Sequence, residues 1–286
     1  MTTHKLDTAG ATLTYDVHGP LPTADGRPPL LMTGLPMEAD GFAALAAFFP
    51  DRTVVTYDPR GLGRSVRSDG AVDNVPAVHA EDVHAVIEAL GAGPVELFAS
   101  SGGAIVALAL VTAHPEDVTT LVAHEPPLLT VLPDAAAAER AADGYRAAYA
   151  ARGFGAGMAT FIAMTSWDGE FSDDYFAAPA ADPAAFGLPV DDDGSRDHPL
   201  LSQRSRPVLA YRPDIAALTA APTRIVIGYG EESTGTVTER TSTALAERLG
   251  ERPVVFPSHH GGFTGPESGY PGQPEAFARI LRDTIG

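Results

Sequence analysis

Short apolar runs alternate with helix-like segments along most of the chain. The runs are 30-LLMT-33, 53-TVVTY-57, 95-VELFA-99, 120-TLVA-123, 224-RIVIG-228 and 253-PVVFP-257. Between them, apolar residues recur on one helical face over 83–90, and residues 104–111 are continuously apolar. Continuous apolar strands that alternate with helices are typical of a parallel sheet with helices on both faces. The pattern therefore predicts a doubly wound α/β domain.

Two segments depart from this alternation. Residues 11–18 (ATLTYDVH) alternate between apolar and polar positions, which predicts an antiparallel edge strand. Between 126 and 212 an Ala-rich helical run is followed by aromatic and Met residues and then by an acidic, Pro-rich loop. We interpret 126–212 as a helical cap inserted into a core domain formed by 1–125 and 213–286.

The charge balance narrows the function classes. The 286 residues include 19 Lys and Arg against 37 Asp and Glu, a net charge of −18. Such an acidic surface repels phosphate backbones and anionic lipids, so we expect no nucleic-acid partner and no membrane partner. Cysteine is absent, which excludes disulfides and a thiolate nucleophile. With no apolar signal segment and no run of the roughly 18–20 residues that a span requires, we expect a cytoplasmic protein.

A candidate nucleophile lies in the turn between the strand at 95–99 and the apolar helix that follows. The sequence around Ser101 reads small-x-Ser-x-small and matches the nucleophile elbow G-x-S-x-G, with Ala99 in place of the first glycine. Such a sharp turn requires small residues two positions to either side of the serine. Ser101 has Ala99 and Gly103 there, whereas a turn centred on Ser100 would place Phe98 in the crowded position. Ser101 is therefore the candidate nucleophile.

Two further turns add to this motif. They are 33-TGLP-36, in which Thr33 stands in place of a more usual His, and 58-DPRGLGRS-65. With these motifs the chain resembles the α/β-hydrolase family from about residue 11 to 286. The resemblance implies a mostly parallel, eight-stranded sheet with the cap inserted after strand six. It also implies that the Leu35 amide helps to form an oxyanion hole, and the Gly102 amide at the helix start is the second candidate donor.

The resemblance also implies that the general base follows the last strand, because the family order is serine, acid, histidine. The segment 253-PVVFPSHHGGF-263 offers His259 and His260, and we favour His260 because it directly precedes two glycines. No cofactor and no metal are implied. No pair of histidines has a metal-binding spacing, and no H-E-x-x-H motif is present.

The acid has two candidates. Ser233 stands where relatives carry the usual Asp, with Glu232 beside it, whereas Glu125 directly follows the strand at 120–123. Glu125 lies 24 residues beyond Ser101, a separation that fits one helix, a short turn and one strand. Both residues would then reach the same edge of the sheet. We favour Glu125 over Glu232.

These residues predict a serine hydrolase that cleaves a small or medium hydrophobic ester or lactone through an acyl-enzyme. We expect a small-molecule substrate and a monomer or homodimer. Four cap residues either line an apolar pocket or pack the cap onto the sheet: Phe154, Met158, Phe161 and Trp167. A carbon–carbon bond hydrolase or a perhydrolase could use the same triad. A non-hydrolytic binding protein, or a cyclase or lyase that uses the pocket, is a further alternative.

Overall fold

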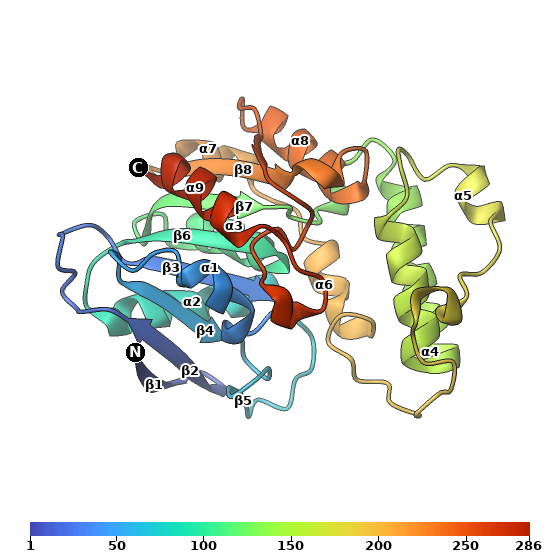
Figure 1. The fold of residues 1–286 in the computed structure, drawn as a ribbon, viewed down its shortest axis with the longest axis horizontal. Coiled ribbons are helices and arrows are strands. Elements are labelled where there is room, and N and C mark those ends of the chain that lie inside the picture. The colour runs from blue at the N-terminus through green and yellow to red at the C-terminus, as the bar shows by residue number, and fades with distance from the viewer.

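The computed structural model describes residues 1–286 and is built around one large sheet (Figure 1). Its strands are β1 (Thr2–Thr8), β2 (Ala11–His18), β3 (Leu30–Leu35), β4 (Val54–Asp58), β5 (Val66–Arg67), β6 (Val95–Ser101), β7 (Val118–His124), β8 (Arg224–Gly230) and β9 (Val254–Phe256). Eight of them follow the order β1-β2-β4-β3-β6-β7-β8-β9, and the two-residue β5 pairs with β2. Strands β3, β4 and β6–β9 pair in parallel, whereas β1, β2 and β5 are antiparallel. The predicted α/β fold with a mostly parallel sheet is confirmed.

The prediction that residues 11–18 form an edge strand was wrong. This segment is β2, which pairs with β4 on one side and with β1 on the other, and β1 is the true edge. The sequence of β1, TTHKLDT, is almost entirely exposed and contains a single aliphatic residue. Because the strand buries so little, no hydrophobic periodicity marked it.

Helices cover both faces of the sheet. They are α1 (Ala43–Ala46), α2 (Pro76–Leu90), α3 (Gly102–Ala113), α4 (Ala135–Thr165), α5 (Asp173–Ala177), α6 (Arg206–Leu209), α7 (Ile215–Ala220), α8 (Val237–Arg248) and α9 (Pro274–Ile285). Side chains alternate between the two faces of each strand. Leu31 and Leu97 belong to a core with α2, α3 and α8, whereas Leu30 and Phe98 belong to a second core with α1 and α9. None of the helices combines the length and the hydropathy that a bilayer crossing requires.

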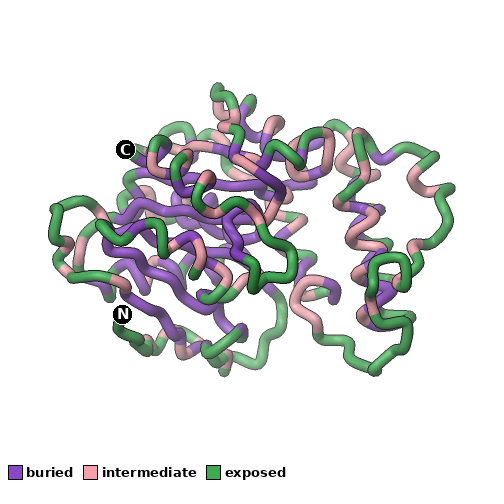
Figure 2. Tube along the Cα trace, viewed as in Figure 1, coloured by how far each residue is buried: buried purple, intermediate pink, exposed green.

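Helices α4, α5 and α6 fall within the segment 126–212 and stand beyond one end of the sheet (Figure 1). Helix α4 contributes most of a separate cluster of buried side chains, which includes Tyr145, Tyr149 and Met164. The loop around α5 is largely exposed, in contrast to the buried central strands (Figure 2).

Helix α4 changes direction at Gly153, which has a non-helical backbone with φ of 80°. A Cβ at Gly157 would lie 2.6 Å from the Cβ of Tyr149, and the rings of Tyr145 and Phe161 have centroids 5.4 Å apart. In a straight helix, residues 145 and 161 would lie about 24 Å apart. The second half of α4 therefore folds back along the first, with Gly153 at the tip.

Candidate active site

Ser101 occupies a strained turn. It is the last residue of β6, directly before α3, and its backbone has φ of 57° and ψ of −129°. Residues other than glycine rarely adopt such a conformation, which costs about 1–3 kcal/mol. A Cβ on Gly102 would lie 2.6 Å from the carbonyl oxygen of Leu35, and one on Gly103 would lie 2.6 Å from the Cα of Gly34. The two glycines therefore allow the start of α3 to approach the end of β3.

This close approach also positions the two candidate oxyanion donors. Leu35 is the last residue of β3 and pairs with Ser101 in the parallel register of β3 and β6. Gly102 is the first residue of α3, so its amide has no partner within the helix and lies at the positive end of the helix dipole. Both residues, together with Ser101, line the same cavity.

Glu125 and His260 are joined by a hydrogen bond. The His260 Nδ1 lies 2.5 Å from Glu125 Oε2, and the other carboxylate oxygen accepts a hydrogen bond of 2.9 Å from the Gly230 amide. The Glu125 side chain is fully buried. An ionised carboxylate can only accept, so Nδ1 carries the proton and Nε2 is left as the acceptor. Of the two carboxylates considered from the sequence, Glu125 is the one that contacts His260.

Each member of this pair shifts the pKa of the other. Burial raises the pKa of Glu125, but the neighbouring His260 outweighs burial and holds that pKa well below its usual range. Burial lowers the pKa of His260, but the charge of Glu125 and its hydrogen bond outweigh burial and raise that pKa. The arrangement therefore stabilises the ion pair that forms when the imidazole takes up a proton.

The alternative residues do not belong to the hydrogen-bonded pair of Glu125 and His260. His259 accepts a hydrogen bond from the Gly261 amide at its Nδ1, 3.0 Å away, and its Nε2 lies 3.2 Å from the Pro271 carbonyl. Glu232 lines the cavity but makes no hydrogen bond to His260. Ser233, at the family's usual Asp position, also lines the cavity.

A cavity of about 660 Å³ lies between the cap and the carboxyl ends of the strands. Ser101 and His260 both line it, without a hydrogen bond between their side chains in this structure. Catalytic hydrogen bonds are often long in unliganded enzymes and tighten when substrate binds. The nucleophile and base predicted from the sequence thus face one common space.

Of the four cap residues expected as pocket lining, the structure places Phe161 in the cavity wall. The other three lie outside the wall. Phe154 packs against the ring of His198, Trp167 packs against Tyr175, and Met158 packs within the cap cluster. Phe154 and Met158 lie near the tip of the folded helix, which explains why helical spacing alone did not separate them from Phe161.

Several cavity-lining residues were not found from the sequence. They are Asn74, Tyr145, Ser205, Val208, Leu209 and Val237. They come from a loop, three helices and a 3₁₀ turn that are distant in the sequence. No local motif marks them, because they meet only when the cap packs against the core.

Comparisons with known proteins agree with this architecture. A family model described as "alpha/beta hydrolase fold" matches residues 29–164. The chain is 27% identical over 266 residues to the uncharacterized hydrolase YraK of Bacillus subtilis. The matched region covers 91% of this chain and 89% of that protein.

Two solved structures are similar over nearly their whole length. A thermophilic esterase from Thermogutta terrifontis has a TM-score of 0.64 at 19% identity, with 100% of this chain and 98% of that chain covered. An enol-lactonase from Burkholderia xenovorans LB400 has a TM-score of 0.64 at 16% identity, with 99% of each chain covered. At these identities the similarity establishes a shared fold.

Proposed function

We propose that this protein, an α/β hydrolase by its fold and by the family model that it matches, is a serine hydrolase that cleaves a small or medium hydrophobic ester or lactone. One observation carries the proposal. Ser101, on a strained turn, lines the same cavity as His260, and the His260 Nδ1 is hydrogen-bonded to the buried Glu125. A nucleophile, a base and a group that orients the base are the parts that acyl transfer requires.

In this mechanism His260 Nε2 takes the proton of Ser101 as the serine Oγ attacks the substrate carbonyl carbon. The carbonyl π electrons move to the oxygen, and the Leu35 and Gly102 amides stabilise the resulting oxyanion. The imidazolium then gives its proton to the leaving alkoxide, which leaves an acyl group on Ser101. A water molecule, deprotonated by His260, then attacks the acyl carbon. The bond to Ser101 Oγ breaks, the imidazolium returns its proton to that oxygen, and the acid is released. Glu125 stabilises the imidazolium in both halves of the reaction.

The cavity supports the proposed substrate class. A volume of about 660 Å³ is within the usual range for small-molecule sites, and the walls carry many apolar side chains. Leu129, Phe161 and Met164 are among them. An apolar acyl or alkyl group fits such walls, and the similar folds of an esterase and a lactonase favour the same reaction class.

The test uses p-nitrophenyl butyrate, a simple aliphatic lactone and a fluorophosphonate probe. The Ser101→Ala variant should lose roughly 10⁴-fold or more in kcat, by analogy with other triad knockouts. Mass spectrometry of the labelled wild type should locate the probe on Ser101. The matched control is Ser100→Ala, which removes the neighbouring hydroxyl, 3.4 Å from the His124 ring, and should retain activity.

The outcomes separate the candidate functions. Rapid labelling of Ser101 together with ester or lactone turnover supports the proposal. If the probe leaves Ser101 unmodified and no ester is cleaved, the serine is not activated, and a binding protein or a non-covalent cyclase or lyase becomes the better assignment.

A further inference from the structure

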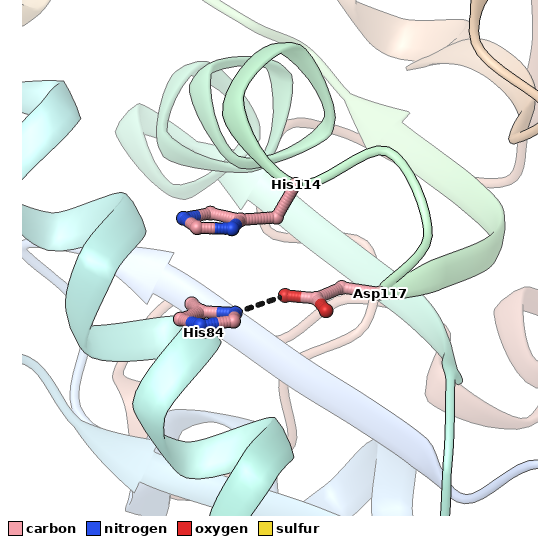
Figure 3. A group of neighbouring side chains, drawn as sticks. All are labelled: His84, His114 and Asp117. Atoms are coloured by element: carbon pink, nitrogen blue, oxygen red, sulfur yellow. Dashed lines mark hydrogen bonds and ion pairs between the residues drawn. The ribbon is translucent and has the colours of Figure 1, made fainter.

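Three potential metal-binding side chains meet on the surface formed by α2 and the turn between α3 and β7 (Figure 3). His84 comes from α2, His114 ends α3, and Asp117 directly precedes β7. Each of the three offers one donor atom, and these atoms all lie within 4.8 Å of one another. The His84 Nδ1 is 2.7 Å from Asp117 Oδ2, and the two imidazole rings stack with centroids 3.7 Å apart.

We propose that this cluster is a zinc site, with His84, His114 and Asp117 as ligands and Glu81 as the fourth. The Glu81 carboxylate lies on α2 one turn before His84, and its Oε1 is 3.0 Å from His114 Nε2. Two imidazole nitrogens and two carboxylate oxygens form a donor set that Zn²⁺ accepts in tetrahedral geometry. Imidazole donors favour zinc and the late transition metals over Ca²⁺ and Mg²⁺, which prefer oxygen ligands.

The distances are compatible with small side-chain movements. Zinc–ligand bonds of about 2.0–2.1 Å place tetrahedral donors about 3.4 Å apart. The His84–Asp117 pair, at 2.7 Å, must therefore open by less than about 1 Å to admit the ion. Among His84, His114 and Asp117, the most distant donors must approach by up to about 1.4 Å. The two stacked rings must also tilt so that their lone pairs converge. The Glu81 side chain is 60% exposed and the two imidazoles are partly exposed, so these three side chains have room to move towards the buried Asp117.

Charge at this surface favours a cation. Glu81, Glu88 and Asp117 surround the two imidazoles, and none of these three carboxylates forms an ion pair with an arginine or lysine. His84 and His114 are their only partners of basic character. A bound dication would pair with these carboxylates more strongly than the imidazoles do. The net charge of −18 on the protein also favours the binding of a cation.

The position of the cluster indicates a structural role. Asp117 directly precedes β7 and Glu125 directly follows it, so about eight residues of extended chain, roughly 25 Å, separate the two. The ion would tie α2 to the α3–β7 turn at the amino end of the parallel strands. The hydrolytic site occupies the opposite, carboxyl end, so the zinc site stands whether or not the proposed hydrolysis is correct.

The test is a titration of the EDTA-treated full chain with ZnCl₂, followed by isothermal titration calorimetry and thermal unfolding. We expect one equivalent of Zn²⁺ to bind. At zinc concentrations of about 100 Kd, the melting temperature should rise by about 5 °C. His84→Ala and His114→Ala should each weaken binding by roughly tenfold or more. His4→Ala removes an exposed histidine on β1 and serves as the matched control, with unchanged zinc binding.

Two controls separate a loss of zinc binding from a loss of folding. Circular dichroism and melting temperatures without zinc show whether His84→Ala and His114→Ala are folded. The hydrolysis rate of p-nitrophenyl butyrate should be unchanged in both variants, because neither residue lines the cavity. Zinc titrations that are identical for the wild type and both variants would overturn the proposal, as would a wild type that binds no zinc or binds Mg²⁺ equally well.

Discussion

Glu125→Gln tests the catalytic arrangement most directly, because the structure determines how the new amide must sit. The Gly230 amide donates to Glu125 Oε1, so the Gln carbonyl oxygen has to take this position. The amide NH₂ then takes the place of Oε2 and faces the His260 Nδ1. Because an NH₂ group can only donate, it forces the proton from Nδ1 to Nε2. In that tautomer the only nitrogen lone pair of His260 is on Nδ1, and Nε2 cannot accept the serine proton.

The expected loss combines two effects. The charge of Glu125 no longer stabilises the imidazolium, and two charges about 4 Å apart interact by about 4 kcal/mol at an effective dielectric constant of 20. That energy alone corresponds to roughly a 10³-fold loss in rate. The wrong tautomer adds to it, and a triad with the analogous Asp→Asn change loses about 10⁴ in kcat. We therefore expect a loss of roughly 10³–10⁴ in kcat with little change in KM.

The assay is steady-state hydrolysis of p-nitrophenyl butyrate, with Glu232→Gln as the matched control. Glu232 also lines the cavity, but its carboxylate makes no hydrogen bond to His260, so its neutralisation should change kcat by less than about threefold. The reasoning fails if Glu125→Gln retains more than about a tenth of the wild-type kcat. It also fails if Glu232→Gln loses as much as Glu125→Gln.

Three further predictions rest on the same geometry. Glu125 raises the pKa of His260, and only the neutral imidazole acts as a base. As the pH decreases, kcat/KM should therefore fall with a midpoint above about 6.5. In the residual activity of Glu125→Gln, the midpoint of this pH profile should be lower. Gly103→Ala would place a Cβ 2.6 Å from the Gly34 Cα, so we expect a loss of roughly 1–3 kcal/mol in the free energy of unfolding. Urea denaturation measures this loss, and an unchanged midpoint of the urea transition would contradict the predicted crowding. Phe161→Ala enlarges the cavity and should change the KM ratio between butyrate and octanoate esters, whereas Phe154→Ala, outside the wall, should leave that ratio unchanged.

Most of the fold could be predicted because the buried parallel strands are continuous apolar runs. The central strands β3, β4, β6 and β7 bury side chains on both faces, so their hydrophobicity is strong enough to stand out from the flanking helices. Strand β1 carries no such signal because its side chains are almost all exposed, and its main connection to the sheet is backbone pairing with β2. Pairing of that kind depends on which strand lies alongside, which a local pattern does not contain.

The fold of the cap and the metal-binding cluster could not be predicted from the sequence, for a different reason. The fold-back of α4 depends on Gly153, and an isolated glycine within an Ala-rich run gives no direction or angle of bending. His84 on α2 and His114 directly after α3 are 30 residues apart, so no short spacing relates them. They meet because α2 and α3 pack against each other, and that is a property of tertiary structure.

Ser101 and Glu125, in contrast, could be linked from the sequence because the register of two neighbouring strands relates them. Ser100 pairs with His124 in the parallel register of β6 and β7. Ser101 directly follows Ser100 and Glu125 directly follows His124, so the two residues lie side by side at the ends of these strands. Both leave their strands with positive φ, 57° and 49° respectively, which neither side chain favours. Adjacent strands lie about 4.8 Å apart, so an imidazole above this edge can reach both side chains. The register of β6 and β7 therefore places the two strained residues side by side, and this determines where the His260 imidazole has to lie in order to reach both.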